Sequence, residues 1–341
     1  MNGFRFYEVR LELETPAVIP LRITRTGYLE PATIIPGATL RGAVITSLYS
    51  NGLISPTVLE NEVRKPSILA TPAYPVVVKN GREYKTLPAT PFMFRCKVCG
   101  KTADQTVRAS ETMASGSQPV PAYSCPSHGP AESLYGRPIY VGAGGLESYA
   151  PKTTYAVSVG VNKFTATSMK GMLYNYEAID AGEVFWARLT VPEELVDKLP
   201  RKLEVLVGRG RSRGFGRAKI ELKDETLPHR QGSKVFIAYS HLTPLEELSY
   251  AGLKVRIRSV CGRLQKILMG WDMAVKAFKP FAKVVRAGAL VAADVSGEDS
   301  AASTMLLSHG GIPLKTGNVW LTGLNVLTSL EDYGSILNME V

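Results

Sequence analysis

The sequence lacks any uninterrupted apolar stretch that approaches the roughly 20 residues needed to cross a bilayer. It also lacks a signal-peptide core, because apolar and polar residues alternate near the N-terminus, with Tyr7, Val9, Leu11 and Leu13 on the apolar side. We therefore expect a cytoplasmic protein with no membrane partner. Charge is sparse, at 21% of 341 residues, and 45% of the residues are hydrophobic. A chain of this size and composition can bury a large core and is typical of a globular protein with two or three domains.

Cysteine is scarce: four residues are too few for a disulfide scaffold in a chain of this length. Their spacing indicates a metal site instead, with Cys96 and Cys99 in a Cys-x-x-Cys pair and Cys125 and His128 in a Cys-x-x-His pair. Two such knuckles supply four ligands to one tetrahedral ion, and thiolates with an imidazole suit zinc. Because protein fills all four positions, we predict a structural Zn²⁺ that holds a polar loop. The alternative is reduced cysteines beside a surface histidine. Cys261 has no ligand type near it and is expected in the core.

Acidic residues are too few to balance the basic ones, and the formal charge is +10 at pH 7. The excess is local: residues 201–230 hold nine Lys or Arg against four Asp or Glu, and residues 254–286 hold nine against one. Two basic stretches fit a track for a nucleic-acid backbone. A membrane surface is disfavoured, because neither stretch has an amphipathic helical pattern with an aromatic face. After residue 286 the sign reverses, with six acidic residues against Lys315, which favours a surface that faces another protein.

The first basic stretch is also rich in glycine, with four glycines and four arginines in residues 208–217. Glycine allows positive φ and lets backbone N–H groups turn toward one anion, while arginine adds forked donors with a fixed charge. Nucleotide-binding loops open a helix, and a Walker loop also needs a Lys-Ser or Lys-Thr pair; neither is present here. Instead Ala218, Ile220 and Leu222 alternate with charged residues, which is the period of a half-buried strand. We predict a loop for RNA phosphates; the alternative is a flexible basic turn.

Hydrophobic periodicity predicts a first unit, residues 1–230, and a second, residues 231–341, joined by a linker at 228–232. A helix with Thr39 as N-cap is expected after the Pro36-Gly37 turn. Residues 56–150, rich in proline, glycine and serine, are expected to form an insertion that carries the metal ligands. Strands are expected at residues 7–13, 155–161, 172–176, 183–191, 217–223, 235–239 and 251–260, with a short helix at 193–199.

A second glycine segment begins at Gly310 and repeats the order of glycines, a basic residue and a strand. This echo suggests one repeated α+β unit. The segment has no arginine, and we do not expect it to bind phosphate as the first loop does.

Several of these segments resemble a known family. Residues 35–43, Ile-Pro-Gly-Ala-Thr-Leu-Arg-Gly-Ala, are similar to the IPGSxLRGA element of the repeat-associated (RAMP) proteins of type III CRISPR interference complexes, and residues 208–216 resemble their glycine-rich loop. Residues 171–177, Gly270-Trp271 and residues 286–288 look most like the type III-D subunit that caps the 5′ end of the guide RNA. The clear resemblance covers residues 33–49 and 155–223. It implies an α+β fold of two tandem ferredoxin-like (RRM-like) domains, with the zinc insertion in the first.

The resemblance also implies that the chain binds the guide RNA (crRNA). Arg41 and the glycine-rich loop would hold its 5′ handle, and residues 157–174 would form a projecting thumb near the first paired nucleotides. In the thumb, Asn162, Lys163 and Lys170 are expected to face RNA. In the loop, the expected contacts come from Gly208, Arg209, Gly210, Arg211, Ser212, Arg213, Gly214, Phe215, Gly216 and Arg217.

Aromatic residues near the loop have two possible roles. Phe215 is a candidate for base stacking, or else anchors the loop in the core. Tyr174 and Tyr176 are expected to pack, because they alternate like one strand face. The implied protein partners are a large polymerase-like subunit and backbone RAMP subunits, and target RNA would be contacted indirectly.

A catalytic role is disfavoured, and a noncatalytic subunit is expected. Backbone subunits of these complexes cut target RNA with an aspartate in the loop after the first strand, but this chain has no aspartate before Asp104. Guide-processing relatives use acid–base chemistry, often with a histidine. His229 lies in the linker and His309 in the acidic end, so only His241, after a strand, is a fair candidate.

Three alternatives stay open at this point. The first is a metal-independent endoribonuclease that acts on repeat RNA, and the second is a backbone-type RAMP subunit of the same complex. The third is a zinc-bearing interaction module whose basic stretches bind another nucleic acid.

Overall fold

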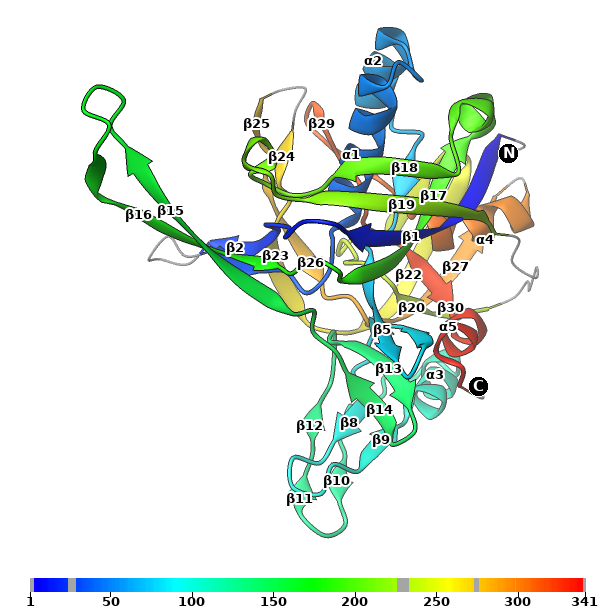
Figure 1. The fold of residues 1–341 in the computed structure, drawn as a ribbon. Coiled ribbons are helices and arrows are strands. Elements are labelled where there is room, and N and C mark those ends of the chain that lie inside the picture. The colour runs from blue at the N-terminus through cyan, green and yellow to red at the C-terminus, as the bar shows by residue number, and fades with distance from the viewer. Residues whose placement is uncertain (1–2, 24–28, 226–232, 273–275, 298, 340–341) are drawn as a thin grey trace.

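The structure, a computed structural model, describes residues 3–23, 29–225, 233–272, 276–297 and 299–339, without the side chains of residues 21–23, 29–31, 170, 173, 174 and 300. The fold mixes helices and strands and consists mostly of strands (Figure 1). Within the described ranges, no helix is long and apolar enough to cross a membrane. The predicted linker at 228–232, and with it the predicted boundary at residue 230, lies outside the described residues.

The first sheet is built around strand β1 (Phe4–Leu13). Its alternation places one apolar face in a core shared with helix α1 (Gly37–Ser50), and Leu11 lies between Phe185 and Ile220 on the neighbouring strands. Both neighbours run antiparallel to β1, and the strands predicted around residues 7–13, 183–191 and 217–223 are confirmed. The spatial order is β18 (Lys202–Leu206), β19 (Arg217–Asp224), β1, β17 (Val184–Pro192), β5 (Tyr74–Lys79) and β6 (Arg82–Lys85), with β4 (Leu69–Ala70) also paired to β17.

The helices of this first half differ in detail from the prediction. Helix α1 begins at Gly37 with Pro36 as its N-cap, so the predicted cap at Thr39 is wrong: Thr39 lies in the first turn, and its N–H bonds to the Pro36 carbonyl. Helix α2 (Pro56–Arg64) follows, capped by the Ser55 side chain. The short helix predicted at 193–199 is a 3₁₀ helix, η1 (Glu193–Lys198).

The second sheet has the order β21 (Glu247–Tyr250), β22 (Leu253–Cys261), β27 (Leu290–Ser296), β20 (Val235–Ala238) and β30 (Leu327–Ser329). Helix α4 (Ser300–His309) connects β27 toward β30, and α5 (Leu330–Leu337) follows β30. The second glycine segment lies here. Gly310 caps the C-terminus of α4, and Gly311 is buried with φ +70° against the Leu324 carbonyl, so this segment is a packed helix end.

The two sheets share a strand order. Four strands of each unit follow the same spatial order, β19–β1–β17–β5 in the first and β30–β20–β27–β22 in the second. When these four strands are counted along the chain, the spatial order in both units is fourth, first, third, second. The units differ in their helices, since α1 follows the first strand of the first unit and α4 follows the third strand of the second.

The two halves pack on each other across β17, whose nine residues are all buried. Tyr239 of the second half makes edge-to-face contacts with Tyr74 and Trp186, at ring-centroid distances of 5.0 and 5.8 Å. Arg188 lies in this contact and binds Asp332 of α5. Asp332 was expected in an acidic, protein-facing end, but it points inward because the buried guanidinium needs a counter-charge.

The range 56–150, expected as an insertion, also contributes to the first sheet. Its strands β4, β5 and β6 belong to that sheet, and only the later part forms the separate lobe at the bottom of Figure 1. The elements after β6 are β7 (Leu87–Pro88), β8 (Met93–Arg95), β9 (Thr102–Asp104), α3 (Thr106–Ala114), β10 (Ser124–Cys125), β11 (Gly129–Pro130), β12 (Glu132–Ser133), β13 (Pro138–Gly142) and β14 (Gly145–Ser148).

Hairpins extend from both sheets. The longest, which we call the thumb, consists of β15 (Thr153–Val161) and β16 (Ser168–Ile179) and projects far from the body (Figure 1). The remaining hairpin strands are β2 (Pro20–Ile23), β3 (Leu29–Pro31), β23 (Leu264–Leu268), β24 (Trp271–Asp272), β25 (Ala277–Phe278), β26 (Phe281–Val285), β28 (Leu314–Thr316) and β29 (Val319–Leu321).

Candidate nucleic-acid interface and metal centre

The glycine-rich loop joins β18 to β19 at the edge of the first sheet and contains a single 3₁₀ turn, η2 (Arg211–Arg213). Two of its glycines are required by close backbone approach. Gly208 and Gly216 both have φ +79°. A Cβ on Gly208 would lie 2.5 Å from the Val18 carbonyl oxygen, and a Cβ on Gly216 would lie 1.9 Å from the Val207 carbonyl oxygen. The loop can therefore take this shape only with glycine at these two positions.

Backbone hydrogen bonds fix the loop to the chain segment after β1. The Arg209 N–H donates to the Val18 carbonyl at 2.9 Å, and the Gly216 N–H donates to the Pro16 carbonyl at 2.9 Å. Between the loop ends, the Val207 N–H donates to the Gly216 carbonyl at 2.8 Å. These contacts make the flexible-turn alternative a poor description, because both ends of the loop are held.

The tip of the loop keeps its donors free. In the described part of the chain, the N–H groups of Gly210, Arg211 and Ser212 have no hydrogen-bond acceptor, and Arg209, Arg211 and Arg217 form no ion pair. Other arginines in or next to the first sheet are paired with carboxylates, among them Arg5, Arg10, Arg188 and Arg201. Unpaired cations and N–H groups are thus concentrated at one place, an arrangement that suits an anion.

Arg213 connects the loop to the base of the thumb. Its guanidinium lies 4.9 Å from the centre of the Tyr176 ring, and Nη1 donates to the Tyr176 hydroxyl at 3.0 Å. Phe215 is partly buried against the same ring, at a centroid distance of 6.4 Å. Its ring also packs closely over Gly210, where an added Cβ would lie 3.0 Å from Phe215 Cδ2. Phe215 therefore anchors the loop in this structure, and its role in base stacking stays a prediction. Tyr176 packs, as expected, whereas the side chain of Tyr174 lies outside the described part.

Arg41, which was predicted to contact RNA, forms hydrogen bonds within the protein. Its Nη2 bonds the Glu62 carboxylate at 2.7 Å, and its Nε donates to the Ile68 carbonyl at 2.7 Å. The guanidinium thus ties α1 to α2 and to the segment between α2 and β4, and the side chain is only 15% exposed. These contacts favour a structural role for Arg41, and its expected contact with guide RNA stays a prediction that they do not support.

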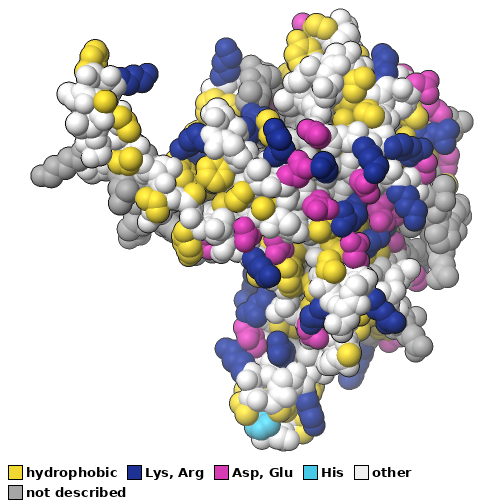
Figure 2. Space-filling model, viewed as in Figure 1, with side chains coloured by type: hydrophobic (Ala, Val, Ile, Leu, Met, Phe, Trp, Pro, Cys, Tyr) yellow, Lys and Arg dark blue, Asp and Glu magenta, His cyan; other side chains and the backbone are white. Residues whose placement is uncertain are grey.

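The thumb carries the other residues predicted to face RNA. Asn162 shapes its turn, since Oδ1 accepts the N–H groups of Phe164 and Thr165 at 2.9 and 3.4 Å, while Lys163 is exposed beside it. The side chain of Lys170 lies outside the described part. One face of β15 exposes Tyr155, Val157, Val159 and Val161, and hydrophobic side chains run along the thumb in Figure 2.

Among the residues that the structure describes, no histidine forms a hydrogen bond or ion pair with the glycine-rich loop. His241 Nδ1 accepts the Ala287 N–H at 3.1 Å, and burial together with the charge of Arg286 lowers its pKa to about 4. His309 is buried 3.1 Å from the Glu225 carboxylate. His229 lies outside the described residues.

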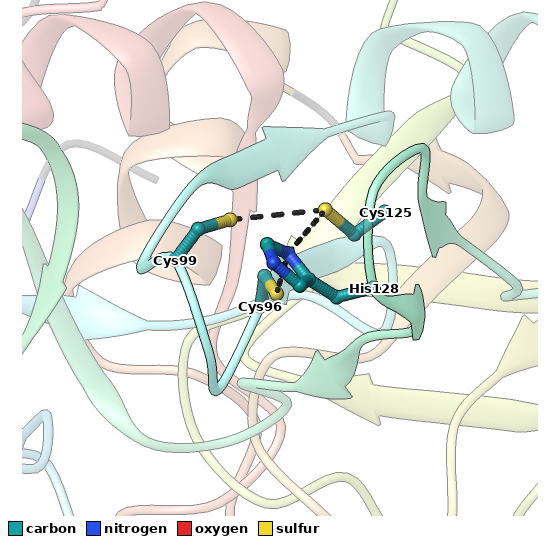
Figure 3. A group of neighbouring side chains, drawn as sticks. All are labelled: Cys96, Cys99, Cys125 and His128. Carbon is teal, nitrogen blue, oxygen red and sulfur yellow. Dashed lines mark hydrogen bonds between the residues drawn. The ribbon is translucent and has the colours of Figure 1, made fainter.

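The four predicted metal ligands converge in the lobe (Figure 3). Cys99 Sγ lies 3.8 Å from Cys125 Sγ, and His128 Nδ1 lies 3.7 Å from Cys96 Sγ and 3.6 Å from Cys125 Sγ. The hydrogen bond from the Ser127 N–H is the main cause that lowers the pKa of Cys125 to about 6, which favours the thiolate that binds metals. These residues form a group that could hold a metal ion. Cys261 lies outside the group and is buried, as expected.

The sequence analysis missed three pairings in these sites: Arg41 with Glu62, Arg213 with Tyr176, and the Gly216 N–H with the Pro16 carbonyl. These partners meet only through the tertiary fold. The alternation of residues 172–176 was a signal for Tyr176 as a packing residue, but nothing local identified Arg213 as its partner.

No family model matches the sequence, and no curated protein is significantly similar to it. Solved structures of low similarity do match. A chain of the type III-B Cmr-beta complex bound to cognate target RNA and AMPPnP covers 84% of this chain and 86% of its own, with 16% identity and a TM-score of 0.47. A chain of the Csm3-Csm4 subcomplex of the type III-A CRISPR-Cas interference complex covers 95% and 99%, with 14% identity and a TM-score of 0.44. Cmr4 from Pyrococcus furiosus, in its oligomeric form, covers 65% and 100%, with 13% identity and a TM-score of 0.28. Two of these three solved chains come from type III CRISPR complexes.

Proposed function

We propose that this chain is a noncatalytic subunit of a type III CRISPR ribonucleoprotein complex and binds the 5′ handle of the crRNA. The observation that carries the proposal is the glycine-rich loop: a backbone held at both ends, with unpaired arginines and free N–H groups at its tip. The loop lies at the position in the sequence where the resemblance to RAMP proteins implies a loop that binds crRNA. The large polymerase-like subunit and backbone RAMP subunits would be its neighbours.

The strand orders support the fold that the resemblance implies. The order last–first–third–second is that of a ferredoxin-like sheet, and it occurs once in each half. Each half would then be a reduced ferredoxin-like domain, the first with α1 and only a 3₁₀ turn as its second helix, the second with α4 alone.

RNA would bind mainly through its backbone. The N–H groups of Gly210, Arg211 and Ser212 can share one phosphate, and Arg209 and Arg217 can neutralise adjacent ones. Arg213, already bound to Tyr176, would position the loop against the thumb. Because these contacts are electrostatic, the affinity should fall with salt by a slope of roughly 0.7 per neutralised phosphate.

Replacing the loop arginines tests this role. In R209A/R211A/R213A, the slope of log affinity against log salt should become flatter. The matched control is R5A/R10A/R201A, which removes the same charge from three ion-paired arginines in or next to the same sheet and should leave the slope nearly unchanged. If both triple variants change the slope equally, the loop is not the RNA site.

The RNA that copurifies with the native assembly tests the handle assignment. A uniform 5′ end followed by a variable remainder is expected for a guide. RNA with random ends would contradict handle binding, even if the salt slope depended on the loop.

The noncatalytic assignment has its own test. Labelled repeat RNA incubated with the purified chain and chelator should stay intact. Cleavage that is lost in His241→Ala would overturn the assignment in favour of the endoribonuclease, although a ring whose Nδ1 accepts a backbone N–H and whose pKa is about 4 is a poor general acid.

The metal proposed for the lobe is zinc in a structural role. Tetrahedral zinc, with Zn–S of about 2.3 Å and Zn–N of about 2.0–2.1 Å, separates two sulfurs by about 3.8 Å and a sulfur from a nitrogen by about 3.5 Å. The observed separations of 3.6 to 3.8 Å fit this geometry. Three thiolates and one imidazole would fill the coordination sphere and leave no position for a reacting water.

A further inference from the structure

A second arm, described at residues 264–272 and 276–285, leaves the second sheet at the place that corresponds to the thumb. The thumb is the last hairpin before β17, the third strand of its unit, and the arm is the last hairpin before β27, the third strand of the other. The arm consists of β23 paired with β26, followed beyond a kink at Gly270 (φ +82°) by β24 paired with β25.

The inner and outer faces of the arm differ in chemistry. Ile267 and Ala282 face inward and pack beside Met269 in a small core with the β28–β29 hairpin. On the outer face, Lys266 lies directly opposite Lys283, and both are exposed. In the part of the chain that is described, neither lysine forms an ion pair. Like charges directly opposite each other destabilise a hairpin, so this pair favours a bound anion.

Large aromatic side chains flank the two lysines. Phe281, on the same face, is 73% exposed. Beyond the kink, Trp271 and Phe278 are 50% and 57% exposed and meet edge to face at 5.0 Å. Lys279 fixes this tip, because its Nζ donates to the Trp320 carbonyl at 3.2 Å and lies 3.6 Å from the Asp272 carboxylate.

We propose that the outer face of this arm binds single-stranded RNA, with Trp271, Phe278 and Phe281 as stacking surfaces for unpaired bases and Lys266 and Lys283 as phosphate contacts. Exposed aromatics beside unpaired cations are what single-stranded nucleic acid requires, since every base offers a ring face and every nucleotide a charge. The basic excess in residues 254–286, nine against one, favours this polyanion over a protein partner.

One strand, β2, lies between the arm and the chain segment that holds the glycine-rich loop. Strand β2 lies against β23, and β2 begins two residues after Val18, whose carbonyl holds Arg209. One RNA strand bound at the loop could therefore continue onto the arm. The inference rests on the proposal that the chain binds RNA, and it adds a second contact that recognises bases by stacking.

Tryptophan fluorescence provides the test. Unstructured oligouridine and oligoadenosine should quench the Trp271 emission of the full chain, whereas a duplex RNA of equal length should not. The variant W271F, which keeps an aromatic ring, isolates the Trp271 signal by difference. In W271A/F278A the affinity for the single strand should fall by about 10-fold or more with an unchanged salt slope, because stacking releases few counterions.

The lysines give an independent readout. K266Q/K283Q should lower the salt slope by about 1.4, two phosphates at 0.7 each. Because both lysines are exposed and repel each other, circular dichroism of K266Q/K283Q should match the wild type and its thermal unfolding should be no less stable.

The two proposals fail in distinguishable ways. If R209A/R211A/R213A flattens the slope but W271A/F278A and K266Q/K283Q bind RNA like the wild type, the arm inference is wrong and the loop proposal stands. If RNA quenches nothing and Trp271 is shielded only in the assembled complex, the arm is a protein contact. If no RNA binds the wild type, both proposals fail.

Discussion

The guanidinium of Arg188 forms a two-point ion pair with the carboxylate of Asp332, with Nη1 at 2.7 Å from Oδ2 and Nη2 at 2.9 Å from Oδ1. Arg188 lies in β17 at 1% exposure, and its Nη2 also donates to Glu225 Oε1 at 3.0 Å. One buried cation is thus shared by a carboxylate just after β19 and another in α5. The pair joins the two halves of the chain.

Removing this cation should destabilise the whole chain. In Arg188→Met two carboxylates lose their buried partner, and we expect the free energy of unfolding to fall by about 3–5 kcal/mol. Arg201→Met is the matched control: Arg201 pairs with Asp224 at the surface, so this variant should lose much less stability than Arg188→Met. Urea unfolding measures both, and equal losses would show that burial of the Arg188 pair does not matter.

Stability should also fall in acid through this cluster. Burial alone would raise the pKa of Glu225, but the hydrogen bond to His309 and the charge of Arg188 outweigh it and lower the pKa to about 2. The pKa of Asp332 is lowered too, since Arg188 and Thr328 outweigh the effect of its burial. A carboxyl group with a depressed folded pKa stabilises the fold above its unfolded pKa, near 4.5, and this stability is lost as the pH falls toward 2.

The variant Glu225→Gln separates this cluster from the other carboxylates. The difference in unfolding free energy between wild type and variant should be about 3 kcal/mol at most near pH 7 and should shrink toward zero below pH 3. A difference that stays constant from pH 7 to pH 3 would contradict the depressed pKa of Glu225.

Local patterns predicted several of the strands and pointed to the two candidate sites. The period-two alternation of β1 and β19 is a short-range signal, as are the ligand spacing from Cys96 to His128 and the glycines of residues 208–216. Each of these is set by neighbours in sequence, so one sequence suffices to find it.

Long-range partners could not be predicted in this way. Arg41 has the charge and motif position of an RNA contact, and only the fold brings Glu62 to it. Residues 69–77 have little periodicity because both faces of the chain are buried there, so they were assigned to the insertion and not to the first sheet. A fully buried strand gives no alternation by which to recognise it.

Chelation should loosen the metal-binding lobe and leave the two sheets intact. Metal analysis should find about one zinc per chain, because four protein ligands complete one tetrahedral site. After a strong chelator, hydrogen exchange should rise in residues 93–133, which the knuckles hold, and change little in β1 and β17. Cys96→Ser should behave like the chelated protein, while Cys261→Ala, outside the group, should keep its metal. Unchanged exchange in residues 93–133 would show that the lobe folds without the ion.

The two glycines of the motif at residues 35–43 should respond oppositely to the same substitution. A Cβ at Gly37 would lie 2.4 Å from the Ala70 carbonyl oxygen and 2.9 Å from the Cα of Gly323 in the second half, so Gly37→Ala should destabilise by about 1–3 kcal/mol or more. Gly42 is exposed in the same helix, with no atom near a Cβ, and Gly42→Ala should stabilise by up to about 1 kcal/mol through helix propensity.

Because both variants add one methyl group to α1, the difference between their unfolding free energies isolates the close approach to Ala70 and Gly323. If Gly37→Ala were as stabilising as Gly42→Ala, α1 could move away from these atoms at no cost. If instead the two variants diverge while both keep the wild-type salt slope for RNA, the motif stabilises the packing of the two halves, and the arginines of the glycine-rich loop supply the RNA contacts.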